Sequence, residues 1–282
     1  MGEDLRRPSE TRHIVITGGS RGLGFALARA FLDLGCRVTL AGRTEASTRA
    51  ATDRLRESLP SRAGVLDGVA CDVTRTDQLE GLWQRARAHG PVDVWINNAG
   101  VSPPLAPLWE IPSHALEDVM DTNVRGTLLG SWVALRGMRE QQRGTIYNLE
   151  GFGADGTAVR GALAYGASKC AVGYVSKALA REARGGSVHV CTIEPGAVRT
   201  DMTAATWYGP NVSKVMSAAI DALALDPDEV ARLLAPRILK NRRNGARIRP
   251  WNGVVAWARL LFLPFRGILR RRGTRALPGS AR

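Results

Sequence analysis

The sequence predicts an α/β protein in which helices cover both faces of a doubly wound parallel sheet. Short apolar runs of strand length alternate with longer stretches of helical period, and the first run leads directly into a glycine-rich turn. The chain has 282 residues, enough for one such domain with a substantial core. We therefore expect a single domain with short appendages.

The expected elements follow one another in regular alternation, without internal repeats or low-complexity segments. The apolar runs that we expect to form strands are His13–Thr17, Arg37–Ala41, Val65–Cys71, Val92–Ile96, Gly144–Leu149 and Val188–Ile193. The clearest helical periods are Gly22–Leu34, His114–Arg139 and Leu163–Arg184. In such sheets ligands bind beyond the carboxyl ends of the strands, near the point where the winding direction reverses. Site residues should therefore lie just after each strand.

The excess of positive charge in this chain comes from its C-terminal part. The formal net charge is +13, but residues 1–229 hold 25 basic and 26 acidic residues, whereas fourteen basic residues and no acidic one follow Glu229. Residues 251–265 are apolar and aromatic, and an arginine cluster at 270–272 follows. This run is shorter than the roughly 20 residues of a membrane-spanning helix and contains Arg259. Two interpretations stay open: peripheral membrane contact through residues 251–272, or a helix that packs on its own domain or on a second subunit.

Three parts follow from this division: an N-terminal arm at 1–12, an α/β domain at 13–236 and a basic amphipathic extension at 237–282. The first residues contain no apolar stretch resembling a signal peptide, so we expect a cytoplasmic protein, with the membrane contact just described left open. Four scattered cysteines in apolar stretches suit buried free thiols, and four scattered histidines predict no metal site. The aliphatic residues within the basic tail argue against a nucleic-acid partner.

The glycine-rich turn at Thr17–Gly24 is the first candidate site. Its glycines follow the pattern GxxxGxG. Gly18 permits a tight turn, Gly22 lets backbone amides approach a pyrophosphate, and Gly24 allows close packing of the helix, whose N-terminus faces the anion. The turn therefore predicts a dinucleotide site, which Ser20, Arg21 and Leu23 should also line.

Three further strand ends add to this site. After the second strand stands Arg43 rather than an acidic residue, and with Arg21 it can pair with a 2′-phosphate, which favours NADP(H); the alternative is a solvated loop residue. Asp72, followed by Val73, can accept a hydrogen bond from an adenine amino group or cap the next helix. The loop with Asn98, Ala99 and Gly100 should cross beside the cofactor.

Tyr165 and Lys169 are the candidate catalytic pair. They lie four residues apart at the start of an expected helix, which places both side chains on one face. An adjacent ammonium stabilises a phenolate and should lower the pKa of Tyr165, so that the tyrosine acts as acid or base near neutrality. Taken alone, such a pair is usually no more than a contact on a helix surface.

These motifs, TGxxxGxG, the isolated Asp72, NNAG at 97–100 and YGASK at 165–169, resemble the classical short-chain dehydrogenase/reductase family from about residue 13 to 202. The resemblance implies a Rossmann-type fold and an NADP(H)-dependent oxidoreductase that acts on a carbonyl or alcohol. It implies that Lys169 also binds the nicotinamide ribose and that Asn123 completes a proton relay through water. It also implies assembly into homo-oligomers through the helices expected at 114–139 and 163–184.

The Pro-Gly motif of the same family matches the segment after the sixth strand. The resemblance assigns cofactor contacts to Pro195, Gly196, Val198 and Thr200. Residues from about 202 to 225 should then form a substrate lid. Trp207 and Tyr208 offer apolar faces there, although they can equally be ordinary packing residues.

The chain departs from its family where classical members carry a serine pair whose hydroxyl orients the substrate carbonyl. Glu150 and Gly151 stand at those positions, and the nearest downstream hydroxyl, Thr157, falls elsewhere in the loop. Either the chain is a non-catalytic binder, or it orients a bulky substrate in another way. The presence of Tyr165, Lys169 and Asn123 favours the second interpretation. Loss of one donor to an oxyanion costs on the order of 3 kcal/mol, which slows an enzyme without inactivating it.

The departure is similar to the corresponding region of plant chlorophyll b reductases, a branch of the family. The likeness covers residues 148–156, 164–170 and 226–237 and the basic, apolar tail. It implies NADPH-dependent reduction of the formyl group of chlorophyll b or chlorophyllide b to hydroxymethyl. Alternatives are a reductase of another lipid carbonyl, such as a sterol, keto-lipid or polyketide, and a non-catalytic NADPH-binding scaffold.

Overall fold

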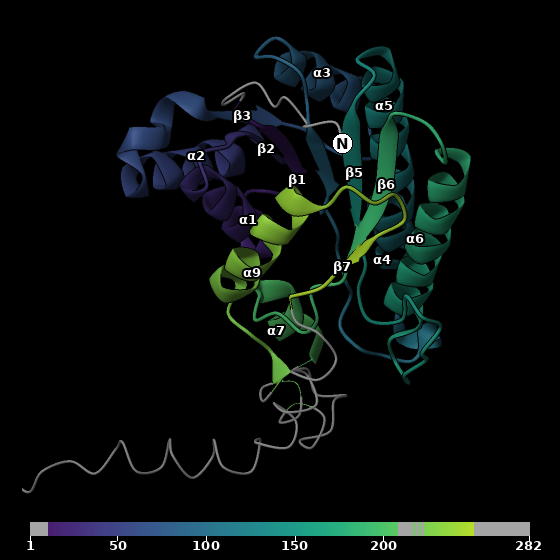
Figure 1. Ribbon diagram of the computed structural model, residues 1–282. Helices are drawn as coiled ribbons and strands as arrows, with labels where there is room; N and C mark the ends of the chain where they lie inside the picture. The colour runs from purple at the N-terminus through teal and green to yellow at the C-terminus, as the bar shows by residue number, and fades with distance from the viewer. Residues whose placement is uncertain (1–10, 208–216, 218–219, 221–222, 251–282) are drawn as a thin grey trace, which may run out of the picture.

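Seven parallel strands form a single sheet in the computed structural model, which describes residues 11–207, 217, 220 and 223–250 (Figure 1). The strand order is β3-β2-β1-β4-β5-β6-β7. The strands are β1 (His13–Thr17), β2 (Arg37–Gly42), β3 (Leu66–Ala70), β4 (Val94–Asn97), β5 (Gly144–Leu149), β6 (Val188–Ile193) and β7 (Arg247–Ile248). The predicted doubly wound parallel sheet is thus confirmed, and its winding reverses between β1 and β4.

Helices cover both faces of the sheet (Figure 1). One face carries α1 (Gly22–Asp33), α2 (Glu45–Ser58) and α9 (Pro227–Lys240), and the other carries α3 (Thr76–Arg87), α5 (Gly126–Glu140) and α6 (Leu163–Glu182). The shorter helices are η1 (Pro60–Val65), η2 (Leu108–Glu110), α4 (Ser113–Val119) and α7 (Asp201–Trp207). Each face has its own core: Phe31 and Tyr147 belong to the first, and Trp83 and Trp95 pack together in the second.

Several predicted boundaries need correction. The helix expected at 114–139 is α4, a π-helical turn η3 (Met120–Arg125) and α5 in succession, and the extra residue of the π-turn comes where the side chain of Asn123 is buried. The strands expected at 65–71 and 92–96 are 66–70 and 94–97. These are shifts at element ends, and the order of elements is unchanged.

The C-terminal boundary of the α/β domain also differs from the expected one. Residue 236 lies inside α9, and β7 pairs with β6 in register Thr192 with Arg247. Tyr147 of β5 donates a hydrogen bond to the carbonyl of Ile238, and Asn241 Nδ2 donates to Tyr147 Oη (3.2 and 3.0 Å). Residues 237–250 therefore belong to the sheet domain rather than to an extension.

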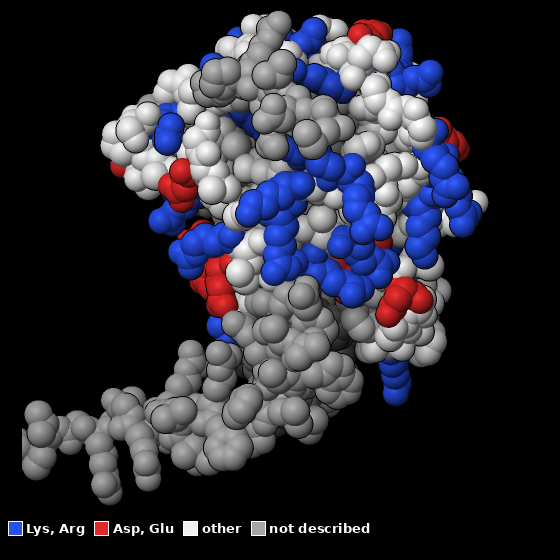
Figure 2. Space-filling view, in the orientation of Figure 1, with Lys and Arg blue, Asp and Glu red and all other residues white. Residues whose placement is uncertain are grey.

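Some expectations lie outside the described residues. These are most of the N-terminal arm, the side chains of Trp207 and Tyr208 in the expected lid, and the tail segment 251–272 with its two interpretations. No helix in the described part of the chain is long and apolar enough to cross a membrane. Basic side chains nevertheless gather on the described surface around the turn between α9 and β7, where Lys240, Arg242 and Arg243 are exposed (Figure 2).

Candidate active site

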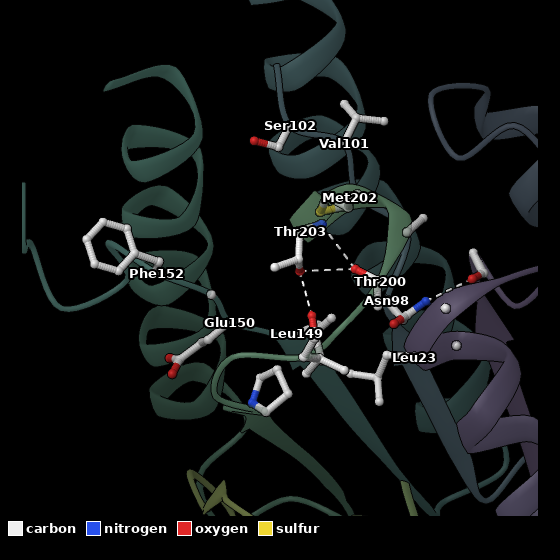
Figure 3. A pocket seen from close by; sticks show the side chains of 18 of the residues that line it. Leu23, Asn98, Val101, Ser102, Leu149, Glu150, Phe152, Thr200, Met202 and Thr203 are labelled. Carbon is white, nitrogen blue, oxygen red and sulfur yellow. Dashed lines mark hydrogen bonds between the residues drawn. The ribbon is translucent and has the colours of Figure 1, made fainter. Parts of the chain in front are cut away.

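A cavity of about 610 Å³ opens at the carboxyl ends of the strands, where the sheet winding reverses. Every predicted cofactor residue lines it except Lys169; these are Gly18, Ser20, Arg21, Gly22, Leu23, Gly24, Arg43, Asp72, Val73, Asn98, Ala99, Gly100, Tyr165, Pro195, Gly196, Val198 and Thr200. Figure 3 shows how part of this lining is contributed by separate segments of the chain. Lys169 and Asn123 lie behind the wall, only 4% and 0% exposed.

The glycine loop forms a cradle that side chains would fill. Gly18 and Gly22 have φ angles of +64° and +57°, which L-residues rarely adopt. A Cβ atom at Gly18 would lie 2.7 Å from Ala99 Cα, and one at Gly22 would lie 3.3 Å from Thr200 Cγ2. The N-cap residue of α1, Arg21, supplies no side-chain hydrogen bond to the first turn, so backbone N–H groups there can meet an anion. These features fit the pyrophosphate of a dinucleotide.

The loop after β4 is tied to the glycine loop. Asn98 Nδ2 donates to the carbonyls of Thr17 and Gly18 (2.9 and 3.0 Å), and Thr17 Oγ1 accepts from the backbone N–H groups of Asn98 and Ala99 (3.1 and 3.2 Å). The amide of Asn98 therefore holds two cavity walls together, and the adjacent residues 99 and 100 face the cavity.

Arg43 and Asp72 face each other at the other end of the cavity. Arg43 Nε lies 3.4 Å from Asp72 Oδ2, and the arginine side chain is 70% exposed. Asp72 Oδ1 accepts from Thr74 N and Oγ1 (3.0 and 2.9 Å). Burial alone would raise the pKa of Asp72, but these hydrogen bonds and the Arg43 charge lower it below its usual range. Asp72 is thus an anion that its neighbours already bind. The second predicted arginine, Arg21, has its Nη1 3.9 Å from Asp201 Oδ2.

Tyr165 and Lys169 lie on the first turns of α6, as their spacing predicted. Lys169 Nζ donates to the Leu149 carbonyl at 3.1 Å and lies 5.7 Å from the centre of the Tyr165 ring. The expected fall in the Tyr165 pKa is wrong for this structure, because burial raises it to about 12. Burial also lowers the pKa of Lys169 to about 8, against the attraction of Glu150. Tyr165 therefore keeps its proton at neutral pH, as a proton donor requires.

The Asn123 side chain has a different setting from the one expected. Its Oδ1 accepts from Val101 N (2.8 Å), and its Nδ2 donates to Val101 O and Ser168 Oγ (both 2.9 Å). The amide thus clamps the loop after β4 to α6 and leaves the side chain no free group that faces the cavity. The π-helical turn that contains Asn123 thus places this residue near Gly100, which also lies near Lys169.

Glu150 and Gly151, at the family's serine positions, both line the cavity. The Glu150 carboxylate is buried and points away from Thr200 and Asn98 (Figure 3) toward Arg247, whose Nη2 donates to Oε1 at 3.2 Å. A Cβ atom at Gly151 would lie 2.5 Å from Tyr165 Oη. Neither position can place a hydroxyl beside Tyr165 as the side chains stand, and Thr157 lines the cavity from an exposed part of the loop.

The segment after β6 closes the cavity opposite the glycine loop. Val198 forms an isolated parallel bridge with Leu225, and Thr200 Oγ1 accepts from Thr203 N at 3.2 Å (Figure 3). This places the Thr200 methyl against Gly22, across the mouth of the cavity. The Pro-Gly motif therefore lines the cavity, and its contact with a cofactor stays a prediction.

Sequence reasoning missed five charged residues of the lining, which are Asp155, Glu194, Asp201, Arg247 and Arg249. Arg249 Nη2 lies 2.8 Å and Arg247 Nη1 3.4 Å from Glu194 Oε2. The only feature of the sequence near Arg247 and Arg249 was the absence of acidic residues after Glu229. That feature gave no reason to place the two arginines at the end of a strand. The cysteines also need one correction: Cys36, Cys71 and Cys191 are buried free thiols, but Cys170 is exposed.

Comparison with known proteins gives one family match and several relatives. The family model for short chain dehydrogenase matches residues 12–210. Two rice (Oryza sativa subsp. japonica) proteins are similar over most of the chain: the probable chlorophyll(ide) b reductase NYC1, 33% identical over 84% of this chain and 49% of its own length, and the chlorophyll(ide) b reductase NOL, 32% identical over 88% and 74%. The chain thus spans only about half the length of the first.

A solved structure with a similar fold contains a nicotinamide cofactor. A single-residue variant of the actinorhodin polyketide ketoreductase, solved with NADPH, has a TM-score of 0.72 and 28% identity, covering 85% of this chain and 95% of its own. The comparisons support a nicotinamide cofactor for this chain.

Proposed function

Because this chain belongs to the short chain dehydrogenase family of oxidoreductases, we propose that it is an NADPH-dependent reductase of a carbonyl on a bulky lipophilic substrate, most specifically the formyl group of chlorophyll b or chlorophyllide b. The observation that carries the substrate is the identity of 32–33% to chlorophyll(ide) b reductases over 84–88% of the chain. The product would carry a hydroxymethyl group in place of the formyl group.

The geometry supports the reducing direction. When bound, the reduced nicotinamide supplies a hydride to the carbonyl carbon. Tyr165, with a pKa raised by burial to about 12, retains its proton at neutral pH and donates it to the carbonyl oxygen. The Lys169 ammonium, 5.7 Å from the ring centre, favours the phenolate that this transfer leaves behind. The glycine cradle and the N-terminus of α1 would hold the pyrophosphate.

Two other functions remain as competitors. The likeness to a polyketide ketoreductase favours reduction of another lipophilic carbonyl, such as a polyketide, sterol or keto-lipid. The absence of the serine pair from positions 150 and 151 favours a non-catalytic NADPH-binding scaffold. The first differs from our proposal in substrate and the second in having no turnover.

A cofactor-oxidation assay over a panel of carbonyls tests the proposal. We expect turnover of chlorophyll b or chlorophyllide b, and a fall of about 10²–10⁴-fold in kcat for Tyr165→Phe with NADPH binding retained. Turnover of steroid or fatty ketones with none of the pigments would exclude the pigment substrate. If Tyr165→Phe leaves every function of the wild-type protein intact, the scaffold interpretation is correct.

The preference for NADPH over NADH has its own test at Arg43. Removal of this guanidinium leaves Asp72 without its cation, so that a 2′-phosphate would meet an unpaired carboxylate. We expect Arg43→Ala to weaken NADPH binding by about 10- to 100-fold and NADH binding far less, measured by nucleotide fluorescence titration. Arg49→Ala, on the exposed side of α2, serves as the matched control. Equal losses for the two nucleotides would contradict the assignment.

A further inference from the structure

An ion pair between a buried carboxylate and a partly exposed arginine occupies the region where the family has its serine pair. Glu150 directly follows β5 and is 3% exposed. Arg247, at the start of β7, donates from Nη2 to Oε1 at 3.2 Å, and its Nε lies 3.1 Å from Oε2 without hydrogen-bond geometry. A buried carboxylate that loses its cation is strongly destabilising, so these two side chains form one unit.

The carboxylate of this unit lies against the helix that carries Lys169. Gly173 is four residues after Lys169 on α6 and therefore on the same face. A Cβ atom at Gly173 would lie 3.8 Å from Glu150 Oε1. Leu149, the residue before Glu150, accepts the hydrogen bond from Lys169 Nζ. The end of β5 thus contacts this face of α6 at two points. The Leu149 carbonyl lies at Lys169, and the Glu150 carboxylate lies about one helical turn further along α6.

Among the residues that the structure describes, the other groups around Lys169 supply no negative charge. Its own helix contributes the phenol of Tyr165 and, two turns on, the exposed Lys177. The π-turn contributes the neutral amide of Asn123, and the loop after β4 contributes Gly100, whose Cβ position lies 3.8 Å from Nζ.

Beyond Glu150 the charges alternate toward the molecular surface. Arg247 lies between Glu150 and Glu194, and Arg249 pairs with Glu194 at the outer end. In the described part of the chain, Glu150 is the group whose charge opposes the effect of burial on the Lys169 pKa. An apolar pair at 150 and 247 could pack as favourably, but it would give the lysine no counter-charge.

We propose that Glu150 is a positioning residue for Lys169. Held by Arg247, its carboxylate keeps the buried lysine protonated and its ammonium on the Leu149 carbonyl beside Tyr165. The site therefore uses the position at which classical members of the family carry a serine to sustain the charge of the lysine rather than to hold the substrate oxygen. The effect of Glu150 on turnover rests on the proposed function, whereas its effect on the charge of Lys169 does not.

The composition of the chain makes a direct measurement possible. It contains only four lysines, at 169, 177, 214 and 240. Protein labelled with ¹³Cε-lysine should therefore give four side-chain signals in an NMR titration from about pH 6 to 11, a window that covers ordinary lysine pKa values. Lys169→Arg identifies the signal of Lys169. The measurement uses the full chain and needs neither cofactor nor carbonyl substrate.

We compare the wild type with Glu150→Gln, with the double variant Glu150→Gln/Arg247→Met and with Glu150→Asp. Loss of the carboxylate should lower the pKa of Lys169 by about one unit in the first two. Glu150→Asp, which keeps the charge, should stay close to the wild type. Glu182→Gln, on the exposed side of α6, is the matched control and should show no change. If Glu150→Gln does not fold, the double variant, which leaves no charge unpaired, decides the question.

An unchanged Lys169 pKa in the folded charge-removing variants would overturn the proposal and leave the ion pair as a structural contact. In an active enzyme the alkaline limb of kcat should move to lower pH together with the lysine, while KM for the carbonyl stays constant. If the pKa falls in these variants but the wild type reduces no carbonyl, the proposed function fails and the assignment of Glu150 stands.

Discussion

Gly151 leaves space for the hydroxyl of Tyr165. A Cβ atom at this position would lie 2.5 Å from Tyr165 Oη and 3.3 Å from Lys169 Cε. Restoring the family's hydroxyl here with Gly151→Ser should therefore displace the tyrosine and reduce kcat by about tenfold or more, since a displacement of about 1 Å at a reacting group can cost 10²-fold.

The matched control for this prediction is Gly81→Ser on α3, where an added Cβ meets nothing within 4 Å. It should leave kcat unchanged, with at most a small change in stability. Steady-state kinetics on both variants check the prediction. A faster Gly151→Ser enzyme would mean that Tyr165 moves aside and that the missing hydroxyl was the limiting feature.

Residue types were predictable where a motif is local. The glycine loop, Arg43 and the Tyr165 and Lys169 pair all lie at the predicted places, because each depends on spacing within one turn or one helix. The partner of Glu150 was not predictable, since Arg247 is 97 residues further along the chain. The predicted direction of the Tyr165 pKa shift was wrong, because the prediction considered only the charge of Lys169 and omitted burial.

At the scale of elements, a buried histidine joins β1 to β2. His13 Nε2 lies 2.8 Å from Thr39 Oγ1, and its Nδ1 has no partner among the described residues. Burial, followed by the charge of Arg37, lowers the pKa of His13 from 6.5 to about 4. The folded state therefore holds this imidazole neutral at a pH where the unfolded chain protonates it.

The consequence is a defined loss of stability in acid. Above pH 6.5 neither state binds the proton, and as the pH falls toward 4 the unfolded state gains it first, so the free energy of unfolding should fall by up to about 3 kcal/mol. Urea denaturation from pH 7.5 to 4.5 measures this. His13→Val should flatten the dependence, whereas the exposed His114→Gln should not. Equal slopes in all three proteins would refute the argument.

Most strands and helices were predictable because their periods are regular, as for β1, β5 and β6, whose bounds match. β7 was not, since two residues are too few to show a period, and it is defined only by its pairing with β6. The π-turn at 120–125 was also invisible, because a helical pattern does not report one inserted residue. Both unpredicted elements touch the candidate site.

At the scale of the whole molecule, α5 and α6 present large apolar side chains to solvent. Leu128, Trp132 and Tyr174 are exposed, Tyr174 by 75%. Large exposed apolar side chains on neighbouring helices are typical of an association surface. We expect a homo-oligomer through these helices, and Trp132→Glu/Tyr174→Glu should lower the number of subunits measured by light scattering after gel filtration.

Leu34→Glu is the control for this prediction, because Leu34 is comparably exposed but lies at the end of α1 on the other face of the sheet. It should keep the wild-type mass. A wild-type monomer, or a double variant with the wild-type mass, would place the assembly surface elsewhere. Retained nucleotide binding in the double variant would show that the fold is intact.

The pairing of Glu150 with Arg247 also has a consequence for the order of events during synthesis of the chain. A chain leaving the ribosome presents the glycine loop, the tyrosine and the lysine early, but the counter-ion of Glu150 is made 97 residues after the glutamate itself. At about 5–20 residues per second, roughly 5–20 s pass in which that carboxylate must stay hydrated or protonated. The ion pair that sustains the charge of Lys169 can thus form only after the last described strand has been translated.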